Sequence, residues 1–281
     1  MLNFCKKIGL GGMPLSIQGR PSEPEALAVI QAALELGVDL IDTANVYCTS
    51  NEDIGHNERL IAKALKRWEN RTQVHVATKG GLERPNGDWT QNAKPKALRL
   101  ACEKSLKALD TERIFLHQLH AVDPEVPIED SVGEFKRLQD EGKIRHIGLS
   151  NVDVEQIERA RKIAQIETVQ NRFNPLCQRD ADNGVLDTCL KHQITYLAYS
   201  PVGGGRWYKA LGENAALLDI ARKYAMTPYQ AMFAFALSKG PHVVAIPGAS
   251  KIASITDSMK ALDVILESED LKRISEIEMV A

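Results

Sequence analysis

The sequence predicts an α/β protein in which eight parallel strands close into one barrel, with a helix after each strand. Short apolar runs that are typical of buried strands alternate with segments of helical spacing along the whole chain. This strict alternation predicts a parallel sheet. Neither a linker nor a change in composition divides the chain, and its length fits a TIM barrel of about 250 residues. We therefore predict a single (β/α)8 barrel domain over residues 1–281.

The first half of the chain supplies four of the predicted strands. Leu27, Ile30 and Leu34 recur at helical spacing, and Gly37 follows them as a helix stop. The strands are predicted at residues 8–11, 38–41, 74–78 and 114–119, and the helices at 24–36, 56–68, 96–109 and 128–142.

The second half repeats the pattern. The run from Ile194 to Tyr199 is nearly all apolar and β-branched or aromatic, as is typical of a buried strand. The strands are predicted at residues 144–149, 168–170, 194–199 and 243–246, and the helices at 155–163, 184–192, 215–224, 229–239, 252–262 and 271–277.

The composition is that of a soluble globular protein, with 44% hydrophobic and 26% charged residues. A net charge of −2 argues against nucleic acid or an anionic membrane as a partner. The five cysteines are scattered without a CxxC spacing, which indicates free thiols in a reducing compartment and predicts no metal site. No apolar stretch is long enough for a signal peptide or a membrane span. We expect a cytoplasmic protein.

Three predicted strands end in side chains that can hold or transfer a proton. Asp42 ends the second strand and Tyr47 follows on the loop, while Lys79 ends the third strand and His120 the fourth. The carboxyl ends of parallel strands form the edge at which such folds bind ligands and carry out chemistry. A cation near a phenol favours the phenolate, so Lys79, held by Asp42, is expected to lower the pKa of Tyr47. His120 can donate a hydrogen bond to a carbonyl oxygen.

Each of these residues also has a purely structural interpretation. Lys79 and Asp42 could form an ion pair that closes the barrel mouth, because a buried ammonium needs a partner. Tyr47 could be an exposed loop tyrosine, and His120 could serve packing alone. Their combination at three strand ends favours proton transfer.

Two glycine-containing loops are candidate phosphate sites. No GxGxxG sequence follows the first strand, so the dinucleotide signature of an open α/β sheet is absent. In barrels, the loops after the seventh and eighth strands commonly bind phosphate, and basic side chains there would add positive charge. The two loops read Ser200-Pro201-Val202-Gly203-Gly204-Gly205-Arg206 and Pro247-Gly248-Ala249-Ser250-Lys251.

The order of these motifs resembles that of the aldo-keto reductase family, and the likeness runs nearly end to end. Asp42 and Tyr47 in IDTANVY, Lys79 in VATKGG and His120 in HQLHAVDP match the family's four catalytic positions. The resemblance implies an NAD(P)-dependent oxidoreductase that transfers hydride between a nicotinamide and an aldehyde, ketone or alcohol. Tyr47 would be the general acid/base, Lys79 and Asp42 would tune it, and His120 would orient the carbonyl.

The resemblance also implies a set of cofactor-binding residues. Those expected to hold the nicotinamide carboxamide are Ser150, Asn151 and Gln170, and Tyr199 would stack on the ring. Those expected to flank the nicotinamide ribose are Gly12 and Met13. Those expected to wrap the pyrophosphate are Ser200, Pro201, Val202, Gly203 and Gly204.

The segment after the last strand departs from the best-known branch of the family. That branch has a lysine, an arginine and an asparagine for the 2′-phosphate and the adenine, where this chain has Gly248, Ser254 and Ser258. Lys251 is the candidate substitute, so the resemblance implies NADP, with NAD as the alternative. The residues expected to contact this part of the cofactor are Gly248, Ser250, Lys251, Asp257 and Ser258.

The expected substrate is a small carbonyl compound or alcohol, and the family favours a monomer. Candidate pocket-lining residues are Met13, Cys48, Trp89, Arg172, Phe173 and Trp207. Two alternative functions stay open. One is a regulatory subunit that binds the cofactor with negligible turnover, and the other is a Schiff-base lyase or aldolase with Lys79 as nucleophile.

Overall fold

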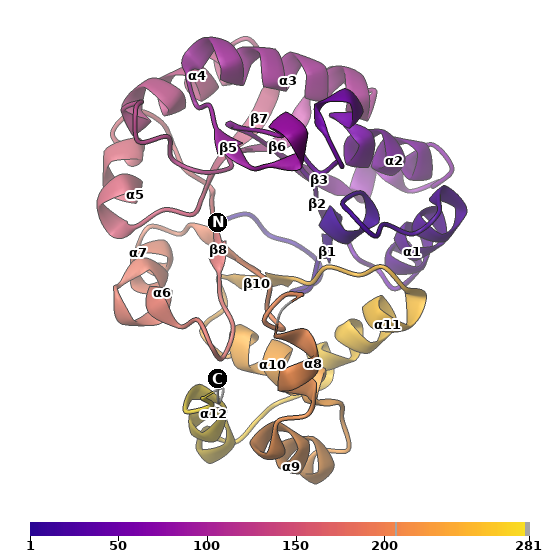
Figure 1. The fold of residues 1–281 in the computed structure, drawn as a ribbon. Coiled ribbons are helices and arrows are strands. Elements are labelled where there is room, and N and C mark those ends of the chain that lie inside the picture. The colour runs from indigo at the N-terminus through magenta and orange to yellow at the C-terminus, as the bar shows by residue number, and fades with distance from the viewer. Residues whose placement is uncertain (206, 279–281) are drawn as a thin grey trace.

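Eight parallel strands form a barrel inside an outer ring of helices (Figure 1). The structure is a computed structural model that describes residues 1–205 and 207–278. Each barrel strand pairs in parallel with the next. The predicted (β/α)8 TIM barrel is confirmed, and its strands are β1 (Leu10–Gly11), β2 (Leu40–Asp42), β3 (His75–Gly80), β6 (Ile114–Leu119), β7 (Ile144–Ser150), β8 (Thr168–Arg172), β9 (Thr195–Tyr199) and β10 (Val243–Ile246).

The barrel closes between β10 and the segment that contains β1. The Gly9 amide donates to the Ala245 carbonyl, and the Ala245 amide donates to the Lys7 carbonyl, both at 2.9 Å. The Gly11 amide donates to the Pro247 carbonyl at 2.8 Å. These bonds bring the ends of the first and last strands together, and with them the loops that follow.

The helices lie outside the strands, and several begin at capping signals in the sequence. Ser22 and Glu25 form a capping box at the start of the first helix. No helix in the described part of the chain combines the length and the apolar character needed to cross a bilayer. The α-helices are α1 (Glu23–Glu35), α2 (His56–Leu65), α3 (Pro95–Leu109), α4 (Ile128–Asp140), α5 (Val154–Arg161), α6 (Arg179–Asp182), α7 (Val185–Lys191), α8 (Tyr208–Gly212), α9 (Ala215–Lys223), α10 (Pro228–Leu237), α11 (Ile252–Lys260) and α12 (Ser268–Ser275).

The structure also contains short strands and helices in segments that were predicted from the sequence to be loops. After β3, the strands β4 (Leu82–Glu83) and β5 (Thr90–Gln91) form an antiparallel hairpin above the barrel mouth. The helices α6 and α8 were also unpredicted, because each is shorter than two turns and shows no periodicity. The 3₁₀-helices are η1 (Met13–Leu15), η2 (Asn51–Asp53), η3 (Arg71–Gln73), η4 (Pro85–Gly87) and η5 (Ala261–Asp263).

Alternate residues of the strands point into the barrel and form two layers. The lower layer is apolar and belongs to one buried cluster that includes Leu40, Ala77, Leu116, Leu197 and Val244. Because side chains alternate along a strand, the residues two positions further on share the same inward face. On β2, β3 and β6 these residues are Asp42, Lys79 and Gln118, all buried. A polar layer therefore lies on the apolar one, at the carboxyl ends of the strands.

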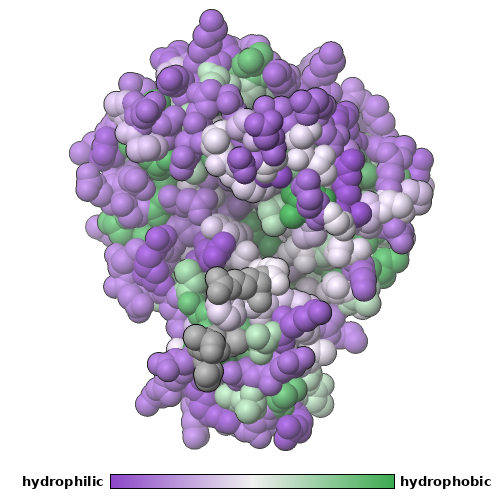
Figure 2. Space-filling model, in the orientation of Figure 1, coloured by the Kyte–Doolittle hydropathy of each residue, from purple (hydrophilic) through white to green (hydrophobic). Residues whose placement is uncertain are grey.

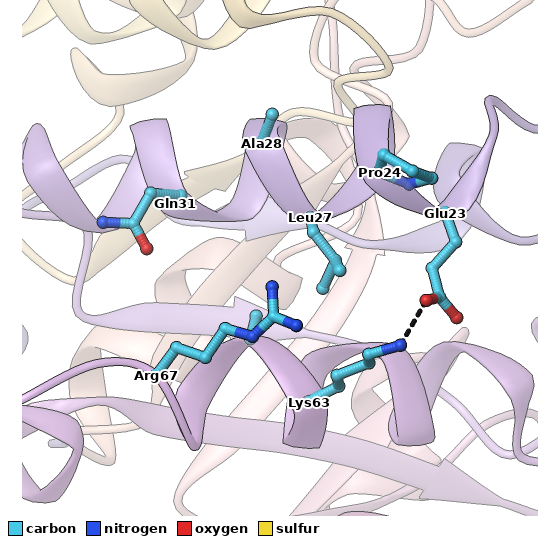
Figure 3. A pocket seen from close by; sticks show the side chains of 8 residues that line it. Glu23, Pro24, Leu27, Ala28, Gln31, Lys63 and Arg67 are labelled. Carbon is cyan, nitrogen blue, oxygen red and sulfur yellow. Dashed lines mark hydrogen bonds and ion pairs between the residues drawn. The ribbon is translucent and has the colours of Figure 1, made fainter.

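A separate groove runs between α1 and α2 on the outside of the barrel (Figure 3). Lys63 and Glu23 form an ion pair across it. The groove is lined by Glu23, Pro24, Leu27, Ala28, Gln31, Lys63, Ala64 and Arg67. None of the strand-end side chains Asp42, Lys79 and His120 lines this groove.

Candidate active site

The ammonium group of Lys79 uses all three of its donors inside the polar layer. Lys79 Nζ donates to Asp42 Oδ2 at 2.7 Å, to the Thr43 carbonyl oxygen at 2.8 Å and to Tyr47 Oη at 3.0 Å. The side chain has no exposed surface. Since an ammonium has only three N–H groups, none is left for another partner. The bond to Tyr47 uses a lone pair of the phenol oxygen, so the phenol O–H can donate elsewhere.

Asp42 is fixed from its other oxygen as well. Gln170 Nε2 donates to Asp42 Oδ1 at 2.7 Å, and Gln118 Nε2 approaches the same oxygen at 3.5 Å. Gln118 is held in turn by Thr168, whose hydroxyl donates to Gln118 Oε1 at 3.1 Å. The carboxylate therefore has donors on both oxygens, which compensates for its burial.

Tyr47, His120 and Trp89 form an aromatic wall above this layer. The ring centroids of Tyr47 and His120 lie 5.7 Å apart, and Trp89 lies 6.4 Å from Tyr47 and 6.2 Å from His120. Each pair meets edge to face. In the view onto this end of the barrel, Figure 2 shows a hollow at the centre of the molecule, with hydrophilic residues around much of its rim.

Burial controls the protonation of the three titratable side chains. Burial raises the pKa of the Tyr47 phenol well above 10, and the negative charge of Asp42 acts in the same direction. The expectation that Lys79 lowers the pKa of Tyr47 is therefore wrong, because burial and Asp42 outweigh it. Burial also lowers the pKa of Lys79, although Asp42 opposes that change. The pKa of His120 falls well below 6.5 through burial and the nearby Lys79, so its imidazole is neutral at pH 7.

The loop after β1 is hydrogen-bonded to the end of β2, beside Asp42. The Gly12 amide donates to the Asp42 carbonyl at 2.8 Å. Asn57 Nδ2 donates to the Gly12 carbonyl at 2.8 Å and to Ser16 Oγ at 2.7 Å, while Thr43 Oγ1 donates to Asn57 Oδ1 at 2.6 Å. Gly12 thus lies beside Asp42, and Met13 follows it, partly exposed.

The residues predicted to hold a nicotinamide carboxamide gather at the ends of β7, β8 and β9. Asn151 has a positive φ of 58°, and its side chain forms hydrogen bonds with three other residues of the site. Its Nδ2 donates to the His120 carbonyl at 2.9 Å and to Ser150 Oγ at 3.1 Å, and its Oδ1 accepts from Tyr199 Oη at 2.8 Å. Through Gln170, this group also joins Asp42.

The loop after β9 turns sharply away from the strand. Ser200, Gly203 and Gly204 have φ values of 50°, 84° and 77°. Asn174 Nδ2 holds the start of the loop through the Ser200 carbonyl at 3.0 Å. Pro201 is buried and Val202 half-buried, and Arg206 lies outside the described residues.

The loop after β10 leads into the start of α11. A side chain at Gly248 would collide with Pro14, since its Cβ would lie 2.7 Å from Pro14 Cγ. Ser250 and Lys251 are exposed. No side chain caps α11 at its first residue, so the backbone N–H groups of this turn have no side-chain acceptor.

Two predicted cofactor residues are engaged within the helices instead. Asp257 accepts from Thr227 Oγ1 at 2.8 Å and from Gln230 Nε2 at 2.7 Å, which joins α11 to α10. Ser258 is 5% exposed, and its hydroxyl donates to the Ser254 carbonyl of the preceding turn at 2.8 Å. The structure does not bring either side chain to the barrel mouth.

Several residues of the site were not predicted from the sequence. Thr43 contributes through its carbonyl oxygen, for which side-chain identity gives no signal. Asn57 and Gln118 act through partners that are distant in the chain. Of the suggested pocket-lining residues, Cys48 and Phe173 have no exposed surface. No group of His, Cys, Asp and Glu side chains that could hold a metal ion occurs within residues 1–205 and 207–278.

The chain is similar to known proteins over nearly its whole length. The family model described as the aldo/keto reductase family matches residues 7–279. A probable aldo-keto reductase 1 from Glycine max is 35% identical and aligns with 96% of this chain and 84% of its own.

Solved structures agree in fold. A thermostable aldo-keto reductase in complex with the inhibitor epalrestat has a TM-score of 0.82 and 29% identity, covering 96% of this chain and 94% of that one. An aldo/keto reductase from Klebsiella pneumoniae in complex with NADP and acetate has a TM-score of 0.80 and 26% identity, covering 95% and 89%. This chain therefore belongs to the aldo/keto reductase family of oxidoreductases, which act on carbonyl and CH–OH groups.

Proposed function

We propose that this protein is an NADP(H)-dependent reductase of aldehydes or ketones that also oxidises alcohols in the reverse direction. The observation that carries the proposal is the bond from Lys79 Nζ to Tyr47 Oη at 3.0 Å. The phenol oxygen accepts from the ammonium, and its own proton is left to be donated. Such an arrangement suits a general acid at the place where an alkoxide develops.

In the reduction, Tyr47 gives its proton to the carbonyl oxygen. The phenol stays protonated at neutral pH because burial raises its pKa. An alkoxide is a stronger base than a phenolate, so the transfer is still favourable. Neutral His120 donates an N–H to the same oxygen and fixes the carbonyl against Tyr47. Lys79 donates to the phenol oxygen, holds it in place and stabilises the phenolate that forms, while Asp42 holds Lys79.

The chain offers a suitable binding surface for the cofactor. The turn of Ser200, Gly203 and Gly204 follows β9 with positive φ values, and the uncapped start of α11 with Lys251 suits a phosphate. Asn151 and Tyr199 stand at the strand ends where a nicotinamide would lie. When bound, the nicotinamide supplies or accepts the hydride. The NADP in the Klebsiella pneumoniae relative supports the choice of this cofactor.

The geometry disfavours a Schiff-base enzyme. A nucleophilic lysine must be neutral and reachable by the substrate. Lys79 has no exposed surface, and its three N–H groups are all donated to protein oxygens. A regulatory subunit would bind the cofactor without turnover, and a turnover assay separates it from the reductase.

The assay follows the loss of NADPH, and separately of NADH, by the purified protein with a panel of small aldehydes and ketones. We expect turnover with NADPH. Tight binding of NADPH without oxidation of the cofactor by any carbonyl would favour the regulatory subunit and exclude the proposed function.

The two directions should depend differently on pH. Reduction uses the protonated phenol, so its kcat/KM should be nearly constant from about pH 6 to 9, because neither Tyr47 nor His120 titrates in that range. Alcohol oxidation uses the phenolate, so its kcat/KM should rise by about tenfold per pH unit over the same range. The measurement is the pH profile of both rates. A break near pH 6.5 in the reduction profile would assign the acid to a histidine and contradict the role of Tyr47.

A further inference from the structure

We propose that Arg84 forms a subsite for an anionic group, a carboxylate or a phosphate, on the carbonyl substrate. This inference rests on the proposed reductase function and specifies its substrate class. Arg84 follows β4 on the hairpin above the barrel mouth and is only 3% exposed. A buried guanidinium is always charged and needs compensation.

The compensation that Arg84 finds within the protein is incomplete. Its Nη2 donates to the Cys48 carbonyl at 3.2 Å. Nε and Nη1 are buried and have no hydrogen-bond partner among the described residues. Within the same part of the chain, Arg84 forms no ion pair with a carboxylate. The N–H groups of two nitrogens are therefore unused, and each nitrogen can donate a charge-assisted hydrogen bond to an oxygen of a carboxylate or phosphate.

Two carboxylates near Arg84 already have partners. Asp53, whose charge acts on the Cys48 thiol together with that of Arg84, pairs with Arg20 at 2.5 Å and with Arg59 at 3.8 Å. Glu83, the neighbour of Arg84 in the chain, is exposed and accepts from Asn92 Nδ2 at 2.7 Å. The protein thus leaves a place for an anion from outside.

The indole ring of Trp89 contacts both Arg84 and the proposed catalytic residues Tyr47 and His120. The Arg84 guanidinium carbon is 3.9 Å from the centroid of the Trp89 ring. That ring meets Tyr47 and His120 at its edges. Through its bond to Cys48, Arg84 also contacts the residue that follows Tyr47. A substrate with its carbonyl between Tyr47 and His120 would extend along Trp89 toward Arg84.

The phosphates of the proposed cofactor are not the anion in question. Arg84 follows β3, the third strand in the barrel order, whereas the pyrophosphate loop follows β9, the seventh. In a closed ring of eight, these strands face one another across the mouth. The substrate lies between the two corners, so its own anionic group is the one that reaches Arg84.

The Trp89 ring shields the Arg84 guanidinium from solvent. The Trp89 side chain is 45% exposed and rests on the Arg84 plane. Because Nε and Nη1 are covered in this conformation, binding requires the Trp89 ring to turn aside. The cation–π contact that is lost is replaced by charge-assisted hydrogen bonds, which are the stronger interaction.

The test compares acids with their methyl esters as substrates of the enzyme with NADPH. The pairs are 4-oxobutanoate and methyl 4-oxobutanoate, and 4-carboxybenzaldehyde and methyl 4-formylbenzoate. In at least one pair, the wild type should prefer the acid. Arg84→Met should lower the acid-to-ester ratio of kcat/KM by at least about tenfold, the effect of one charge-assisted pair. Arg84→Lys, which keeps the charge, should lower it less.

Arg71→Met is the matched control, because it removes the same charge from the exposed 3₁₀-helix η3 at the other end of β3. It should leave the ratio unchanged. The ratio, unlike the absolute rate, is insensitive to general damage from a loosened Trp89. A ratio that is the same in Arg84→Met as in the wild type would overturn the proposal.

A binding measurement separates this inference from the reductase function. Terephthalate and its monomethyl ester differ by one carboxylate, and calorimetry in the presence of NADPH gives both Kd values without turnover. We expect terephthalate to bind more tightly to the wild type, and the difference to disappear in Arg84→Met. An unchanged difference would overturn the subsite, even if the enzyme reduces carbonyls. A lost difference without any turnover would support the subsite while the reductase proposal fails.

Discussion

Replacing Tyr47 by phenylalanine is expected to reduce kcat for carbonyl reduction by roughly 10²- to 10⁴-fold, the usual contribution of a positioned general acid. The substitution removes one oxygen and keeps the ring that packs edge to face on His120 and Trp89. The hydride donor and the carbonyl would still meet, but the alkoxide would lose its proton source. Steady-state rates with NADPH, together with the Kd for NADPH from fluorescence, measure the effect.

Tyr224→Phe is the control for the loss of a hydrogen-bonded, partly buried phenol. Tyr224 Oη donates to Asp270 at 2.8 Å at the outer helices α9 and α12, far in the fold from the strand ends. This variant should lose stability and keep its kcat. The Kd for NADPH should stay within about twofold in Tyr47→Phe, because the ring is retained. Near-normal turnover in Tyr47→Phe would remove the assigned role.

The sequence was sufficient to predict the fold because each βα unit carries its own local signal. The β-branched and aromatic run of residues 194–199 indicates a strand by itself, and it forms β9 (Thr195–Tyr199); Gly37 follows the first helix with a positive φ of 81°. The order of such units then determines the barrel, since parallel strands need a crossover connection. The β4–β5 hairpin was missed because its two strands have only two residues each and pair with nothing else.

The catalytic positions were predictable because polar residues at strand ends stand out against apolar runs. Lys79 is such a residue, and its partner Asp42 lies at the end of the neighbouring strand. The three contacts of Lys79 were not predictable in full, because one is the main-chain carbonyl of Thr43. The direction of the Tyr47 pKa was also missed, since it depends on how completely the ring is buried.

The predicted cofactor residues also differ in how well the sequence predicts their contacts. Asn151 directly follows β7, so the barrel geometry brings it to the His120 carbonyl after β6 and to Tyr199 at the end of β9. Asp257 lies on α11, and the rotation of that helix about its axis determines which neighbours its side chain contacts. In this structure it accepts hydrogen bonds from Thr227 and Gln230. Arg84 was not singled out at all, because an arginine in a polar loop gives no sign of burial until the hairpin is folded.

Replacing Lys79 by methionine should destabilise the protein by about 3–5 kcal/mol, the cost of leaving a buried charge without its partner. The variant keeps the volume of the side chain but leaves Asp42, which is 2% exposed, with only the amide donors of Gln170 and Gln118. Denaturant unfolding of the purified variant gives the free energy of unfolding directly. The kcat should also fall, because the Tyr47 oxygen loses the N–H that holds it.

Adding Asp42→Asn to Lys79→Met separates the structural role of the ion pair from its chemical role. The double variant removes both charges, so its loss in free energy of unfolding should be smaller than the sum of the two single losses, by a coupling of about 0.5–3 kcal/mol. Its kcat should stay low, because a neutral pair restores no N–H donor to Tyr47 Oη and no charge for a phenolate. If activity returned together with stability, the pair would be a structural ion pair alone. If stability failed to recover, the bond of 2.7 Å between Lys79 and Asp42 would not be what compensates these two buried charges.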